Sequence, residues 1–241
     1  MLSKNEVKYI QSLCHKKQRT AERLFIVEGV KLVQELITEG YPVKNIYATA
    51  QWTIPKGDYP VSIISEQELE KISSLQTPNQ VLAIVQQPEL ADEPQWHHKL
   101  TLVLDGIQDP GNMGTIIRIA DWFGIDQIIA SEDTVELYNP KVIQSTMGSF
   151  IRVKVWYRDI ASLLVKKEIP IYGAVLDGQS MYEIQPPNAG ILMIGNESKG
   201  IREDLQSLIH HRITIPKIGQ AESLNAAVAL GILLSQFKRP H

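Results

Sequence analysis

Three stretches of the sequence combine glycines, amides, hydroxyls and charged groups at spacings that could bind a ligand. They are DPGNMGTIIRIADWFG at 109–124, ILMIGNESKGI at 191–201 and ITIPKIGQAESLNAAVALGILL at 213–234. Each contains or follows a short apolar segment typical of a buried parallel strand, and ligands of parallel α/β sheets bind beyond the carboxyl ends of the strands. We therefore expect the three stretches to converge on one site.

The first stretch places Gly111 and Gly114 ahead of an apolar helical run that contains Arg118. Glycines let the backbone approach a ligand closely, and helical side chains point toward the N-terminal end of their helix. Arg118 would then point to the loop, where it could bind a phosphate. The alternative is a salt bridge to Asp121, three residues on. Asn112 is expected to cap this helix.

A dinucleotide site of the NAD type is a competing interpretation of these glycines. Glu132 and Asp133 end the next predicted strand, where an acid could bind a ribose, and this favours it. However, the G-x-G-x-x-G fingerprint is absent, because the glycines stand at 106, 111 and 114. An NAD-dependent oxidoreductase on a Rossmann sheet remains the runner-up.

The other two stretches also carry polar groups next to predicted strands or helices. Gly195 permits close contact with a ligand, and Asn196 and Glu197 either project into the same crevice or begin a helix. Ser223 and Asn225 either cap the following helix or form the floor of a ligand site. That helix is expected to be buried along an apolar stripe formed by Leu224, Ala227, Val228, Gly231 and Leu234.

Strands and helices are predicted to alternate from residue 100 onward, which indicates a mostly parallel sheet covered on both faces. The strands are LTLVLDG, QIIAS, IRVKVW, PIYGAVL, ILMIGNE and HRITIP; the helices span 112–123, about 140–147, 159–168, 200–209 and 223–237. A smaller α/β unit precedes them. Capping-box spacings predict helices from about Lys4 and over 66–74, a further helix spans 30–40, and the strands are LFIVEG, VKNIYAT, YPVSII and VLAIVQQ. Residues 88–98 lack apolar periodicity and are the predicted linker.

The composition fits a globular protein of one or two domains: 241 residues, 44% hydrophobic and 21% charged. A single cysteine, Cys14, no apolar signal-peptide core and no run long enough to span a bilayer predict a cytoplasmic protein. The net charge of −3 gives no global signal for nucleic acid. Residues 1–23 nevertheless carry six basic residues against two acidic ones and form either a phosphate-binding arm or a solvated helix face.

Together and in this order, the three stretches resemble the SpoU (TrmH-like) family of RNA ribose 2′-O-methyltransferases of the SPOUT superfamily. The segment KKQRTAERLFIVEGVKLVQELI at 16–37 resembles the family's ribosomal-protein-like substrate-binding domain. The resemblance implies an RNA substrate-binding domain over 1–87 and a methyltransferase domain with a deep trefoil knot over 99–241. It also implies S-adenosylmethionine as cofactor, a homodimer with active sites near its interface, and RNA as partner, ribosomal rather than transfer RNA.

Family positions carry over to individual residues of this chain. The cofactor would be held by Ala174, Gly195, Ile215, Leu224 and Asn225. The catalytic signature matches Asn112, Arg118, Glu197, Ser223 and Asn225. The RNA would be bound by Lys16, Lys17, Arg19 and Arg23, so deletion of residues 1–23 is expected to weaken RNA binding alone.

Two positions depart from the family pattern. Asp109 stands where some members have asparagine, and Ala227 stands where many have a second serine, so no hydroxyl acts there. We expect Arg118 to bind an RNA phosphate and stabilise charge on the ribose oxygen, because a guanidinium rarely gives up its proton. No metal is expected, and a catalytically silent RNA-binding protein is a further alternative.

Overall fold

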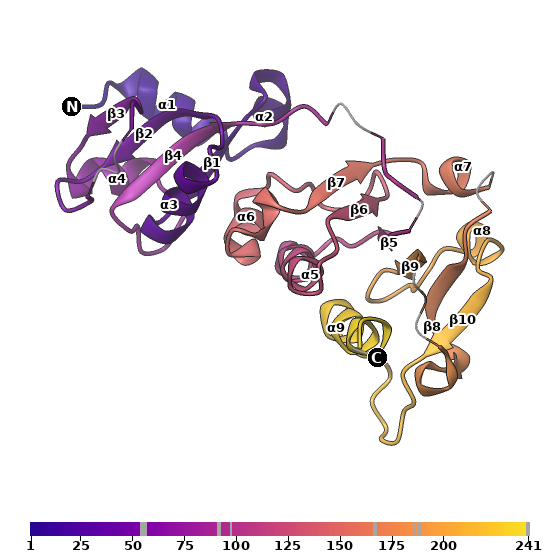
Figure 1. Cartoon of the computed structure of the whole chain (residues 1–241). Helices are drawn as coiled ribbons and strands as arrows, with labels where there is room; N and C mark the ends of the chain where they lie inside the picture. The colour runs from indigo at the N-terminus through magenta and orange to yellow at the C-terminus, as the bar shows by residue number, and fades with distance from the viewer. Residues whose placement is uncertain are drawn as a thin grey trace. The chain divides into compact units, whose positions relative to one another are not determined.

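The computed structural model describes residues 1–53, 57–90, 93–96, 98–165, 168–185, 187 and 189–239. Contacts divide the chain into two compact units (Figure 1). The first comprises Met1–Glu89 and Glu136–Ile151, and the second comprises Leu90–Val135 and Arg152–His241. Residues 91, 92 and 97 of the predicted linker lie outside the described residues, and the predicted domain boundaries stay a prediction.

A four-stranded sheet in the order β1-β4-β2-β3 forms the centre of the first unit. Its strands are β1 (Leu24–Glu28), β2 (Val43–Ala48), β3 (Val61–Ile63) and β4 (Val81–Gln86). Strands β1 and β2 run antiparallel to β4, and β3 runs parallel to β2. The helices are α1 (Lys4–Ser12), α2 (Lys16–Glu22), α3 (Val30–Thr38) and α4 (Glu66–Ile72). The predicted capping boxes at Ser3 and Ser65 are confirmed, whereas α2 is a helix that we did not predict.

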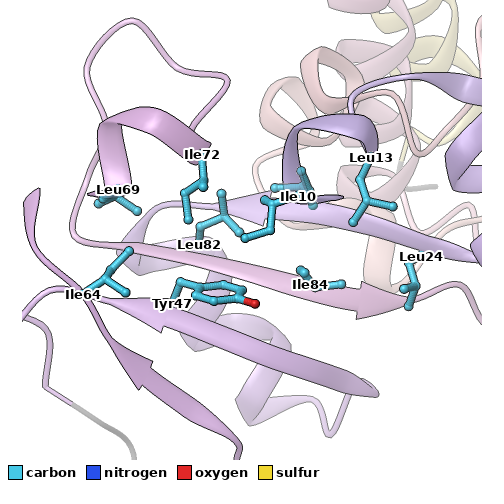
Figure 2. Close-up of a cluster of buried hydrophobic side chains, with 10 residues drawn as sticks. Ile10, Leu13, Leu24, Tyr47, Ile64, Leu69, Ile72, Leu82 and Ile84 are labelled. Atoms are coloured by element: carbon cyan, nitrogen blue, oxygen red, sulfur yellow. The ribbon is translucent and has the colours of Figure 1, made fainter. Parts of the chain in front are cut away.

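One apolar cluster joins α1 and α4 to the sheet (Figure 2). Ile10 and Leu13, from α1 and its end, are fully buried among side chains of α4 and of strands β1, β2 and β4. Burying aliphatic side chains of this size stabilises a fold by about 1.5–3 kcal/mol each. Helix α1 therefore contributes to the core of the first unit, and residues 1–23 do not form a separate arm.

The segment 136–151 also belongs to the first unit, although its sequence lies inside the predicted second domain. It contains α6 (Pro140–Thr146) and the 3-10 turn η1 (Ser149–Ile151). The Phe25 ring of β1 lies 4.6 Å from the ring centre of Tyr138 and 5.8 Å from that of Phe150. Gln144 donates a hydrogen bond of 2.9 Å to the carbonyl of Glu28. The core of the first unit is thus completed by a segment that, in the sequence, interrupts the second unit.

The second unit contains a six-stranded sheet in the order β10-β8-β9-β5-β6-β7, and all five strand pairs are parallel. The strands are β5 (Leu100–Leu104), β6 (Gln127–Ala130), β7 (Lys154–Tyr157), β8 (Ile171–Ser180), β9 (Gly190–Ile194) and β10 (His211–Thr214). The helical segments are α5 (Pro110–Trp122), α7 (Ile160–Leu164), η2 (Met181–Glu183), α8 (Glu203–Gln206) and α9 (Ala226–Phe237). The predicted α/β class with a parallel sheet is confirmed; the trefoil knot stays an expectation from the resemblance.

Helices α7 and α8 pack on side chains that alternate along the central strands, such as Val103, Ile191 and Met193. Helix α5 packs against α9 (Figure 1). Both α7 and α8 are shorter than predicted; residues 166 and 167 of the predicted 159–168 helix lie outside the described residues. No helix within the described ranges is long and apolar enough to cross a membrane.

The start and burial of α9 differ from the prediction. The helix begins at Ala226 because the Asn225 side chain caps it, accepting hydrogen bonds from the amides of Ala227 and Val228. The expected buried stripe is confirmed at Ala227 and Leu234, whereas Gly231 is half-buried and two positions were wrong. Leu224 precedes the helix and is 46% exposed, and Val228 is 51% exposed.

Candidate functional site

The three polar stretches meet in a chain of side-chain hydrogen bonds. The Nδ2 atom of Asn225 donates to Oδ1 of Asn112 at 2.8 Å, and Nδ2 of Asn112 donates to Oε1 of Glu197 at 2.7 Å. These partners are 113 and 85 residues apart in the sequence. Both ends of the Asn112 amide are engaged, so its orientation is fixed by its neighbours.

The way in which α5 and α9 are capped leaves the side-chain amides of Asn112 and Asn225 available for these hydrogen bonds. Asp109, and not Asn112 as predicted, caps α5: its Oδ1 accepts the Asn112 amide at 2.8 Å. Pro110 occupies the first turn, where its missing N–H costs nothing. Asn225 uses Oδ1 to cap α9 and keeps Nδ2 free to reach Asn112. Asp109, one of the two departures from the family pattern, therefore sets the start of α5.

A pocket of about 740 Å³ lies next to these hydrogen-bonded side chains, beyond the ends of β9 and β10. It is lined by four of the predicted cofactor residues and by two of the predicted catalytic residues: Ala174, Gly195, Ile215, Leu224, Glu197 and Ser223. Asn225, predicted for both roles, stands between the lining residues Leu224 and Ala226 and faces Asn112. One wall is the segment after β10, where Ile218 is fully exposed.

Arg118 lies on the exposed side of α5 and does not line the pocket. The alternative salt bridge to Asp121 is wrong, since Asp121 pairs with Arg152, at 3.0 Å from Nε and 2.8 Å from Nη2. Within the described part of the chain, the Arg118 guanidinium has no hydrogen bond or ion pair. It is thus available to a ligand, whereas Arg152 holds the other end of α5.

Sequence reasoning missed an ionic cluster around Arg202, the residue that follows the pocket-lining Ile201. Asp105 follows β5, is 1% exposed and accepts the Arg202 backbone amide at 2.8 Å, while Nη2 of Arg202 lies 2.6 Å from its other carboxylate oxygen. Asp133, considered above as a ribose ligand, lies 3.8 Å from Nη1 of Arg202. The Ser131 hydroxyl, with Arg202, lowers the pKa of the Asp133 carboxyl. The one signal in the sequence was an acid directly after the apolar run LTLVL.

The four predicted RNA-binding residues differ in exposure. Lys16 and Lys17 at the start of α2 are exposed, and Arg23 is exposed and paired with Glu89. Arg19 is 2% exposed, pairs with Glu136 and donates to the Leu13 carbonyl at 2.9 Å. The expectation for Arg19 needs correction, because a guanidinium held by internal partners is not free for a phosphate.

Comparison with known proteins gives the following similarities. The sequence model of the SpoU rRNA Methylase family matches residues 99–235, and that of the MRM3-like substrate binding domain matches residues 4–83. The chain is 34% identical to the 23S rRNA (guanosine(2553)-2′-O)-methyltransferase RlmP of Bacillus subtilis, over 96% of each chain. It superposes on a TrmH-family structure from Porphyromonas gingivalis (TM-score 0.89, 39% identity, 99% of each chain). The AdoMet-bound rRNA methyltransferase of Sinorhizobium meliloti gives a TM-score of 0.86 at 28% identity, over 99% of this chain and 96% of that one.

Proposed function

The chain belongs to the SpoU rRNA methylase family, and we propose that it transfers a methyl group from S-adenosylmethionine to a ribose 2′-hydroxyl of ribosomal RNA. The observation that carries the proposal is the hydrogen-bonded chain Asn225–Asn112–Glu197 beside the pocket. Family membership overturns the runner-up, an NAD-dependent oxidoreductase. The predicted cytoplasmic location would place the enzyme with its substrate.

The pocket residues fit S-adenosylmethionine. A volume of about 740 Å³ lies within the range of small-molecule sites. Ile215, Leu224 and Leu233 offer apolar surface to an adenosine, and the Glu197 carboxylate suits a cationic ligand. When bound, this cofactor supplies a methyl group on a positively charged sulfur.

The residues around the pocket have to position a ribose and help its reacting hydroxyl lose its proton. Asn112, fixed on both sides, and Ser223 would orient the ribose. Glu197 would act by holding Asn112, the partner that the structure gives it. Arg118 would bind the RNA phosphate and stabilise negative charge developing on the 2′-oxygen, and the proton would leave to that phosphate or to water.

Two measurements test this proposal. Calorimetry should show that the protein binds S-adenosylmethionine and not NAD. Incubation with tritiated S-adenosylmethionine and ribosomal RNA should place label on ribose 2′-oxygens. Binding of the cofactor without any labelled RNA would instead favour a catalytically silent RNA-binding protein.

Neutralising the three exposed cations among the predicted RNA-binding residues tests RNA binding. Because α1 is part of the core, deletion of residues 1–23 would unfold this unit, so the charges alone should be changed. The variant Lys16→Gln/Lys17→Gln/Arg23→Gln is expected to weaken RNA binding and to reduce the slope of log K against log salt by about 0.7–0.9 for each lost phosphate contact. Affinity for S-adenosylmethionine should stay unchanged. An unaltered salt slope would place the RNA elsewhere.

We also propose that the chain forms a homodimer through the face of α5 and α9. Trp122 on α5 is 85% exposed and Val228 on α9 is 51% exposed, and these two helices pack together. Large exposed apolar side chains on neighbouring elements are typical of protein interfaces.

Val228→Glu is expected to convert a dimer into a monomer at micromolar concentration, because a charge would be buried without a partner. Sedimentation velocity measures this. Val165→Glu is the matched control, since Val165 is 62% exposed at the end of α7, outside this face, and the control should stay dimeric. A wild-type monomer, or a dimer that tolerates Val228→Glu, would reject this interface.

A further inference from the structure

The segment from Gly195 to Arg202, which carries Glu197, is tied to the end of β5 on both sides of that residue. Before it, Nδ2 of Asn196 donates to the Gly106 carbonyl at 2.7 Å. After it, Arg202 contacts the Asp105 carboxylate with its backbone amide at 2.8 Å and its guanidinium at 2.6 Å. Glu197 is therefore held between two fixed points six residues apart in the sequence.

Between these points the segment has little freedom to move. Asn196 and Gly200 exchange two backbone hydrogen bonds of 2.9 and 3.0 Å, and Oδ1 of Asn196 accepts the amides of Ser198 and Lys199. A Cβ on Gly195 would lie 2.2 Å from the carbonyl carbon of Gly200. The closed turn thus moves as one body, and its position depends on its anchors.

The anchor at Arg202 is the ionic one. Asp105 is 1% exposed, so its carboxylate needs a charged partner, and the half-exposed guanidinium of Arg202 supplies it. Asp133 lies 3.8 Å from the second guanidinium nitrogen and ties the same side chain to the end of β6. Among the described ion pairs of the second unit, Arg202 alone reaches a carboxylate this deeply buried.

From this arrangement we infer that Arg202 and Asp105 are positioning residues of the methyl transfer, which place Glu197 so that it orients Asn112. This inference rests on the proposed function. Arg202 does not touch the pocket itself; it acts through the turn that lines it. Loss of the guanidinium releases the turn, so the Glu197–Asn112 hydrogen bond is no longer held at 2.7 Å. Misplacement of a catalytic group by about 1 Å costs up to about 100-fold in rate.

The test is a double-mutant cycle measured as turnover of the folded full-length enzyme on ribosomal RNA. Arg202→Met and Glu197→Ala are each expected to lower turnover by about 10- to 100-fold. Because both act through the same hydrogen bond, the double variant should be no slower than the slower single variant. Lys99→Met removes an exposed ion pair with Asp126 in the same unit and should leave turnover unchanged, alone or with Glu197→Ala.

A role confined to stability gives a different result. Effects of Arg202→Met and Glu197→Ala that multiply in the double variant would overturn the inference, as would normal turnover of Arg202→Met. If Arg202→Met does not fold, Arg202→Lys can replace it, because lysine keeps a positive charge beside Asp105. Arg202→Lys should lower turnover by a smaller factor, and it should cause no further loss when it is combined with Glu197→Ala. Failure of the wild type to methylate RNA would reject the proposed function, an outcome distinct from additivity in an active enzyme.

Discussion

Arg118→Ala is expected to lower methyl transfer to ribosomal RNA by about 100- to 1,000-fold, a loss typical for removal of one group that stabilises developing charge. Stability should stay within about 0.5 kcal/mol of the wild type, because Arg118 is exposed and has no ion pair among the described residues. Single-turnover assays with tritiated S-adenosylmethionine measure the rate, and chemical denaturation measures the stability. Lys99→Met is the control for loss of an exposed cation in the same unit.

Arg118→Lys separates charge from geometry at this position. A lysine keeps the positive charge but lacks the planar fork that binds a phosphate through two nitrogens. We expect a rate between those of Arg118→Ala and the wild type. Near-normal turnover with lysine would show that the fork is not needed, and more than about one third of the wild-type rate in Arg118→Ala would remove Arg118 from the mechanism.

The second large effect concerns stability. Glu136→Ala should destabilise the first unit by about 3–5 kcal/mol, because it leaves the Arg19 guanidinium, 3% exposed in its side chain, buried without a counter-charge. Hydrogen exchange at the amides of β1 reports on this unit. Glu89→Ala, which breaks the exposed pair with Arg23, should cost less than about 1 kcal/mol.

The double variant Arg19→Met/Glu136→Leu checks the physical reason. Apolar residues of similar size often replace a buried ion pair without loss of stability. We therefore expect the double variant to recover most of the stability that Glu136→Ala loses. A small effect of Glu136→Ala on exchange in β1 would mean that segment 136–151 is not needed to complete this unit.

Local signals in the sequence were sufficient for most of the fold. Capping boxes at Ser3 and Ser65 and runs of branched apolar residues such as LTLVL act over a few residues, so they can be read directly. The start of α9 was misplaced because Ser223 and Asn225 are both good caps, and only the structure shows that Asn225 takes the role.

What the sequence could not show depends on partners far apart in the chain. Arg19 looked like an exposed RNA ligand because its partner Glu136 is 117 residues away. For the same reason, nothing in the sequence placed segment 136–151 in the first unit. The convergence of Asn112, Glu197 and Asn225 was expected from the strand ends and from the family resemblance, whereas the order of their hydrogen bonds was not. Asp105 and Arg202 were missed because helical and strand periodicity carries no information on an ion pair between the end of a strand and the start of a helix.

Methylation of a ribosomal RNA ribose by the site around Asn112, Glu197 and Asn225 can be measured in cells. The experiment is a map of ribose 2′-O-methylation in ribosomal RNA from cells that lack the gene, with the wild-type gene or the Arg118→Ala variant restored. We predict that one defined 2′-O-methyl group disappears, returns with the wild type and does not return with the variant. An unchanged methylation map in cells without the gene would show that this protein does not methylate ribosomal RNA.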